Sequence, residues 1–136
     1  MDPQRRHELW SIALENFRAA RLSLQREWYN VSAGRSYYAA YTAMWLALGG
    51  PVPPHTRWSH EGIAKQFARG EWKREPHPIL RELRKAMGRL YQYRLKADYH
   101  GRKVAASEAR ESLATAGTVL GMVADEFGLP KGALRR

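Results

Sequence analysis

Arg94 and His100 are the residues of this sequence whose types and spacing best suit chemistry on an anion. Arg94 continues a series of apolar residues spaced three or four positions apart, as on the buried face of a helix: Leu80, Leu83, Met87 and Leu90. A guanidinium keeps its charge, so burying it without a partner is costly. We therefore expect Arg94 either to pair with Asp98, one turn further on, or to point into a polar cleft that receives an anion.

Helical periodicity predicts five segments that position these residues, and no segment alternates with period two as a strand would. The segments cover about residues 2–29, 32–48, 59–69, 78–99 and 105–127. The first begins with Asp2 as cap and Pro3 in the first turn. Asn30, Ser32 and Gly34 are expected to interrupt the chain between the first two helices. Gly49 and Gly50 end the second helix, before a short extended linker over residues 51–54.

The predicted fold is all-α, an up-and-down bundle of four long helices plus one short helix. The chain length of 136 residues favours a single domain over residues 1–128, and we expect residues 129–136 to form a flexible basic tail. The chain has no cysteine, which is consistent with a reducing compartment, and no apolar run of membrane-spanning length or signal peptide. We therefore expect a cytoplasmic protein that does not associate with a membrane.

The net charge of +10 is unevenly distributed along the chain. Residues 65–103 contain twelve Lys and Arg residues against four Asp and Glu residues. Clustered positive charge is typical of proteins that bind a polyanion such as a nucleic acid. The alternatives are a well-solvated surface and a surface that complements an acidic protein partner.

Several kinds of active site find no support in the sequence. The glycines do not form a phosphate-binding loop or a dinucleotide fingerprint, and the five histidines show no paired metal-ligand spacing. Carboxylates are scattered, and no serine stands in a recognisable nucleophile setting. We therefore predict no metal and no cofactor, and the candidate chemistry is left to arginine, histidine and tyrosine.

Three stretches resemble the sequence landmarks of HEPN domains (higher eukaryotes and prokaryotes nucleotide-binding). They are GRSYYAAYTA at residues 34–43, WSHEGIAKQF at residues 58–67 and YRLKADYH at residues 93–100. The resemblance implies a helical bundle, a homodimer, RNA or a nucleotide as ligand, and in many relatives a minimal nucleotidyltransferase as partner. It also implies membership of a toxin–antitoxin or defence module.

In ribonuclease relatives the signature is an arginine followed four to six residues later by a histidine, facing the dimer cleft. The resemblance thus assigns Arg94 and His100 to a metal-independent endoribonuclease site. The alternative that it implies is a non-catalytic nucleotide-binding or docking partner of a nucleotidyltransferase. Asp98, Tyr99, Arg35 and Tyr38 are expected to support the site, whereas a turn-and-cap role is expected for His60 of the middle landmark.

Helix geometry limits how Arg94 and His100 can meet. Six positions correspond to about 600° of rotation, so the two side chains do not share a face of an unbroken helix. They converge if the helix ends near Tyr99 or if they meet across two chains. The alternative interpretations are an Arg94–Asp98 ion pair and a His100 ring that interacts with the helix C-terminus.

A row of basic residues follows the same predicted helix: Arg81, Lys85, Arg89 and Lys96. Side chains at this spacing can follow a phosphate backbone, which gives affinity for nucleic acid without sequence selectivity. The alternative is a row that only keeps the bundle soluble.

Overall fold

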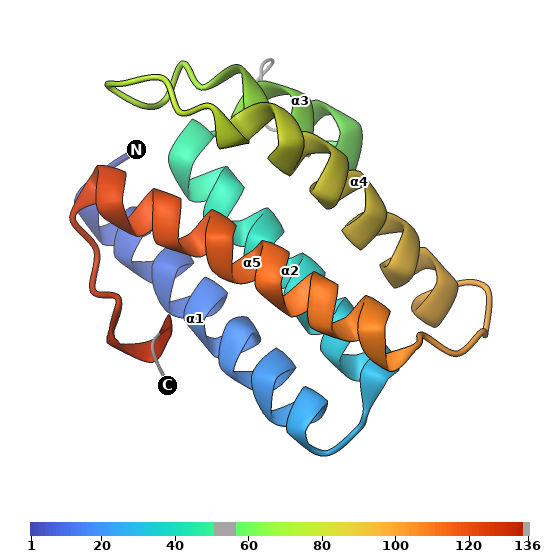
Figure 1. The fold of residues 1–136 in the computed structure, drawn as a ribbon. Helices are drawn as coiled ribbons and strands as arrows, with labels where there is room; N and C mark the ends of the chain where they lie inside the picture. Colours follow the sequence, from blue (N-terminus) through green and yellow to red (C-terminus); the bar gives the residue numbers. More distant parts are fainter. Residues whose placement is uncertain (51–56, 135–136) are drawn as a thin grey trace.

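The computed structural model of the chain describes residues 1–50 and 57–134, and these ranges contain helices but no strand. In chain order the elements are α1 (Pro3–Gln25), α2 (Tyr29–Leu48), α3 (His60–Arg69), α4 (Ile79–Asp98), α5 (Ala106–Phe127) and the 3-10 helix η1 (Gly132–Leu134). The prediction of an all-α bundle with four long helices and one short helix is confirmed (Figure 1). The predicted linker over residues 51–54 lies outside the described residues.

α2 is the central helix, because it packs against each of the other four α-helices. Figure 1 shows α3 and α4 side by side, across α2 from α1. Four alanines of α2 are at most 1% exposed and allow neighbouring helices to approach closely: Ala33, Ala39, Ala40 and Ala43. The tyrosine- and tryptophan-bearing side of α2 is thereby turned toward α3 and α4, where the candidate site lies.

The predicted apolar faces of α4 and α5 form much of the core. Leu80, Leu83, Met87 and Leu90 of α4 are all buried, as the three-and-four spacing predicts. On α5 the same spacing predicts a face of six residues: Ala109, Leu113, Ala116, Leu120, Val123 and Phe127. Four of them are buried, whereas Leu113 and Phe127 are only partly buried. Burial of this face fixes the rotation of α4 about its own axis, and so fixes the direction in which Arg94 points.

The first turn between helices lies earlier than the sequence predicts. α1 ends at Gln25 instead of near Tyr29, and Glu27 adopts a left-handed conformation with φ 62°. The N–H of Trp28 donates a hydrogen bond to the carbonyl of Ser23 at 2.8 Å, which closes the helix end. Because this turn contains neither glycine nor proline, it carries no local sequence signal.

The expectation that Asn30, Ser32 and Gly34 interrupt the helices is wrong, because all three lie inside α2. Ser32 is fully buried, and its hydroxyl donates a 2.8 Å hydrogen bond to the carbonyl of Ala20 on α1. Asn30 accepts a 2.8 Å hydrogen bond from the backbone N–H of Val104. These polar side chains join elements that are distant in the sequence.

Residues 129–134 belong to the predicted flexible tail. In the structure they pack against α1. The Nε1 of Trp10 donates to the carbonyl of Pro130 at 3.1 Å, and Arg21 donates to the carbonyl of Ala133 at 2.9 Å. Leu129 is 8% exposed and contributes to the core.

Candidate nucleic-acid interface

Arg94 of α4 lies against three tyrosine rings, and its side chain is only 14% exposed. Its guanidinium carbon lies 4.7 Å from the ring centre of Tyr37, 4.9 Å from that of Tyr38 and 5.4 Å from that of Tyr99. The Nη2 atom donates hydrogen bonds to the hydroxyls of Tyr38 at 2.8 Å and Tyr99 at 3.2 Å. Cation–π contacts and neutral hydroxyls hold the guanidinium in place without cancelling its charge.

Asp98, the expected ion-pair partner, makes a long contact with Arg94. Its Oδ2 lies 3.6 Å from the Arg94 Nε, beyond hydrogen-bond distance, and its side chain is 43% exposed. The Nε is buried and makes no hydrogen bond with any of the described residues. Arg94 also lines a groove of about 560 Å³ beside α2. Arg94 therefore combines a weak ion pair with Asp98 and a position in the lining of this groove.

His100 lies elsewhere, exposed beyond the end of α4. It lines a second cavity together with Tyr93, Lys96 and Arg102. The backbone N–H of His100 bonds to the carbonyl of Leu95 at 3.0 Å, so the chain turns away directly after the helix. The structure of one chain thus places Arg94 and His100 at two different cavities.

The histidine that shares the groove with Arg94 is His60. Its ring stacks on that of Tyr91, with ring centres 3.3 Å apart and planes inclined by 10°. The cap at this landmark is Ser59, as the sequence predicts for the residue that begins this helix, and its hydroxyl accepts a 2.9 Å hydrogen bond from the N–H of Gly62. Burial lowers the pKa of the His60 imidazole, so the neutral ring predominates at neutral pH.

Tyr41, Trp58 and Arg57 also line this groove. The sequence favours a core or interface position for Tyr41 over a stacking surface, and it marks neither Trp58 nor Arg57 as a site residue. Tyr41 and Trp58 belong to two of the family-like landmarks, which was the signal that could have found them. Their convergence depends on how α3 packs beside α2 and α4. Helical periodicity predicts each helix but not how the helices pack together, so the sequence does not predict the groove.

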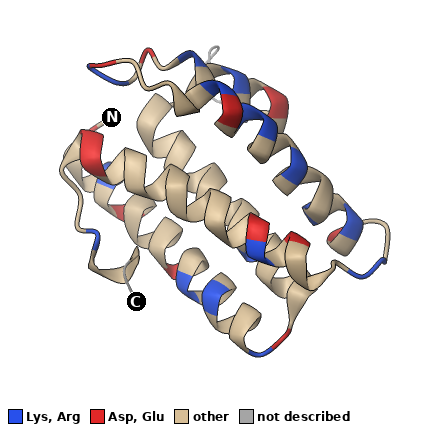
Figure 2. Cartoon of the chain, in the orientation of Figure 1, with Lys and Arg blue, Asp and Glu red and all other residues tan. Residues whose placement is uncertain are grey.

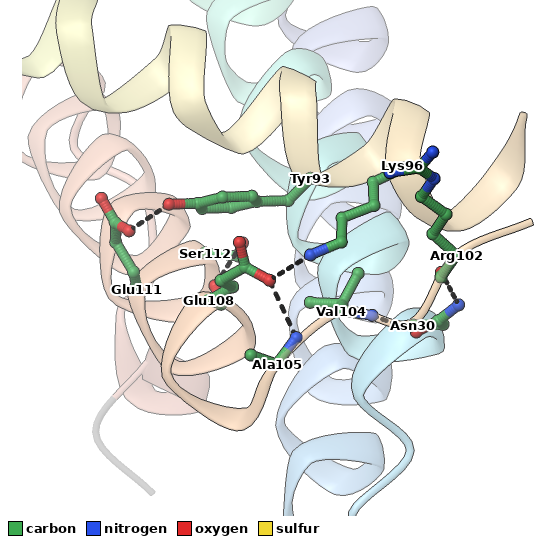
Figure 3. A network of polar contacts seen from close by, with 9 residues as sticks. All are labelled: Asn30, Tyr93, Lys96, Arg102, Val104, Ala105, Glu108, Glu111 and Ser112. Atoms are coloured by element: carbon green, nitrogen blue, oxygen red, sulfur yellow. Dashed lines mark hydrogen bonds and ion pairs between the residues drawn. The ribbon is translucent and has the colours of Figure 1, made fainter. Parts of the chain in front are cut away.

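Two residues of the predicted basic row, Arg89 and Lys96, form ion pairs with α5. The Nζ of Lys96 lies 2.9 Å from Oε1 of Glu108, and the Nε of Arg89 bonds to Oε1 of Glu111. Figure 3 shows the Tyr93 side chain pointing toward Glu111 of α5. The Tyr93 hydroxyl donates a 2.7 Å hydrogen bond to Oε2 of that carboxylate. These contacts connect α4 to α5. They also pair two of the four basic side chains that were expected to contact a nucleic acid with carboxylates of α5.

Arg81 and Lys85, the other two residues of the row, are exposed on α4 and have no ion pair with the described residues. Arg84 of α4, one turn after Arg81, is also exposed. Figure 2 shows that Lys and Arg recur along α4. The N-terminal half of α4 is therefore the part of the row that is free to contact phosphates.

The expected supporting residues fall into two groups. Tyr38, Tyr99 and Asp98 all contact Arg94. Arg35 is separate from this group, because its guanidinium donates a 3.2 Å hydrogen bond to Asn16 of α1.

The family model of the HEPN domain matches residues 7–126. The chain therefore belongs to the HEPN family, a family of nucleotide-binding and ribonuclease-type domains. No curated protein and no solved structure matches the chain.

Two further features bear on the kind of site. In the described residues no group of three or more His, Asp or Glu side chains is placed to hold a metal ion. No helix in the same ranges is long and apolar enough to cross a membrane.

The contacts between α4 and α5 predict how stability depends on pH. The pKa of Glu111 is lowered by hydrogen bonds from Arg89 and Tyr93. A carboxyl whose folded pKa is depressed stabilises the fold above its unfolded pKa of about 4.3, and the contribution is lost as pH falls through the folded pKa. Glu111→Gln should lower the free energy of unfolding at pH 7 by at most about 1 kcal/mol, because the site is partly exposed.

Urea unfolding between about pH 7 and pH 3 measures this effect. The free energies of unfolding of Glu111→Gln and the unaltered protein should begin to approach each other as pH falls below about 4.3. They should become equal once pH is below the lowered pKa of Glu111 in the folded protein. Glu15→Gln is the control, since Glu15 is exposed on α1 and forms no ion pair within the described residues. If the free energies of unfolding of Glu111→Gln and the unaltered protein differed by the same amount at every pH, the lowered pKa of Glu111 would be contradicted.

Proposed function

We propose that this HEPN-domain protein binds RNA as a homodimer in a toxin–antitoxin or defence module, with Arg94 holding a phosphate. The observation that carries the proposal is the environment of Arg94. Its charge is held by tyrosines instead of a close carboxylate, its Nε lacks a hydrogen-bond partner in the described residues, and it lines a groove. A guanidinium in this setting suits a phosphate, which it can contact through two parallel hydrogen bonds.

The free charges of α4 support a nucleic acid as the ligand. Arg81, Arg84 and Lys85 are exposed on the same helix as Arg94 and can contact further phosphates. Such contacts add affinity without selecting a sequence, and they make binding sensitive to salt.

A homodimer is supported by apolar and aromatic side chains that are exposed near Arg94. Val31 and Tyr38 lie seven positions apart on one face of α2 and are 48% and 42% exposed. Tyr99, at the end of α4, is 65% exposed, and Arg94 links its hydroxyl to that of Tyr38. A second copy packed on this face would bury these side chains beside the groove.

RNA cleavage at the dimer cleft is the second candidate function. It is favoured by the position of His100, which is exposed directly after the end of α4 and can face a second copy. In this reaction the oxygen of a ribose 2′-hydroxyl attacks the adjacent phosphorus, and the bond from that phosphorus to the 5′-oxygen of the next nucleotide breaks. His100 transfers the proton from the attacking oxygen to the leaving 5′-oxygen, so the products are a 2′,3′-cyclic phosphate and a 5′-hydroxyl. Arg94 stabilises the charge that develops on the phosphate oxygens, so the reaction requires no metal.

Arg94→Lys tests the phosphate contact. The substitution keeps the charge but removes the planar fork, so RNA affinity should fall about tenfold. Fluorescence anisotropy with a labelled single-stranded RNA at fixed salt measures the affinity. Arg18→Lys is the control, because Arg18 is exposed on α1 and does not line the groove, and it should bind like the unaltered protein. Unchanged affinity in Arg94→Lys, with normal urea unfolding, would refute this role.

His100→Gln tests cleavage separately from binding. In the presence of EDTA, the unaltered protein should cleave RNA and His100→Gln should lose at least about a hundredfold of that activity while retaining RNA affinity. Gel analysis of end-labelled RNA gives the rate. RNA binding without cleavage by the unaltered protein would support the alternative of a docking partner for a nucleotidyltransferase.

Val31→Glu tests the dimer. A carboxylate buried at a contact between two copies is costly, so the variant should dissociate at concentrations where the unaltered protein is dimeric. Sedimentation equilibrium measures the mass. Leu22→Glu is the control, because Leu22 is 49% exposed on α1 and lies outside the proposed contact. A dimer of unchanged strength in Val31→Glu would place the contact elsewhere.

A further inference from the structure

The groove beside Arg94 is walled by aromatic rings. Its lining includes Tyr38 and Tyr41 of α2, Trp58 and His60 at the start of α3, and Tyr91 of α4, with Arg57 and Arg94 as its cationic members. Most large side chains of the neighbouring core, by contrast, are aliphatic. The side chains of this groove therefore combine flat apolar faces with two guanidinium groups.

The wall that contains Trp58 is held firmly in place. The indole Nε1 of Trp58 donates a 2.9 Å hydrogen bond to the carbonyl of Gly49, and its own carbonyl accepts a 2.8 Å bond from the hydroxyl of Tyr41. On the side facing α4, His60 is stacked on Tyr91. Because these contacts hold the rings before any ligand arrives, binding requires little reordering of side chains.

The groove continues into a neighbouring cavity with which it shares Tyr37, His60 and Tyr91. Lys65 and Arg84 line that second cavity. The stacked pair of His60 and Tyr91 thus stands between two cavities, each of which contains two cationic side chains. This alternation of positive charge and aromatic surface matches a chain in which flat bases alternate with phosphates.

We propose that this groove binds an unpaired nucleobase of single-stranded RNA, next to the phosphate held by Arg94. The proposal rests on the proposed function and adds to it the form of RNA that is recognised. The aromatic rings provide stacking surface, while Arg57 and Arg94 contact the flanking phosphates. The base must be unpaired, because in a duplex both faces of a base are covered by its neighbours.

The neutral His60 ring offers one donor and one acceptor nitrogen to the edge of a base. The charged or titratable groups around it are Glu61 on α3, Arg94 and Tyr91 on α4, and Tyr37 on α2. A neutral ring in this position adds hydrogen bonding without adding charge. We therefore expect the stacking to give affinity for any base, with His60 adding selectivity among bases.

Three fluorescein-labelled probes test the proposal by anisotropy at one salt concentration. They are a uridine hexamer, an abasic ribose-phosphate hexamer of the same charge, and a duplex that contains the hexamer sequence. The unaltered protein should bind the uridine hexamer about tenfold more tightly than either of the others, which is the scale of one stacked base.

Tyr91→Leu removes a ring of the groove while keeping an apolar residue that favours a helix. It should reduce uridine-hexamer affinity about tenfold and leave abasic-hexamer affinity unchanged. Trp28→Leu is the matched control, because Trp28 is 53% exposed and lies outside the groove. It should bind both probes like the unaltered protein, and urea unfolding checks that each variant is folded.

The outcomes separate this inference from the proposed function. If Arg94→Lys weakens binding but Tyr91→Leu does not, the base subsite is overturned and RNA binding at Arg94 stands. Equal affinity for the abasic and uridine hexamers, or for the duplex and the single strand, also overturns the subsite. If the unaltered protein binds none of the probes, the proposed function itself fails.

Discussion

The structure of the candidate site depends on how the bundle accommodates the charge of one guanidinium. Arg94 continues the apolar spacing of α4, yet its closest polar partners are the hydroxyls of Tyr38 and Tyr99. A close carboxylate would cancel the charge and leave little to attract an anion. Tyrosine rings and hydroxyls instead reduce the cost of partial burial while the positive charge persists. The nearly buried arginine is thereby compatible with both a stable bundle and a binding groove.

Aromatic side chains have a second role in this arrangement, because they define the groove as well as the support for Arg94. Tyr37 is shared by the core, the Arg94 contact and both cavities. Burial raises the pKa of its hydroxyl, so this ring stays neutral over the physiological range. Tyr37 therefore connects the packing of the core to the position of the Arg94 guanidinium.

The helices were largely predictable from the sequence, whereas the site was predictable only in part. Apolar spacing along α4 and α5 correctly identified Leu83 and Leu120 as core residues, because each helix buries one face. The α1–α2 turn at Glu27 was not predictable, since it lacks a glycine or proline. The separation of His100 from Arg94 and the approach of His60 arise from packing between helices. Spacing within one helix carries no information about such contacts.

Asn30 has a consequence for how the two signature residues can come together. Its amide donates to the carbonyl of Arg102 at 2.9 Å and accepts from the N–H of Val104, while the N–H of Arg102 bonds to the carbonyl of Lys96. The segment that contains His100 is therefore held by hydrogen bonds on both sides, to Lys96 of α4 before it and to Asn30 of α2 after it. Within one chain this arrangement leaves the imidazole and the guanidinium at two different cavities. In the proposed homodimer, the His100 of a second copy would approach Arg94 with these hydrogen bonds of Asn30 and Arg102 intact.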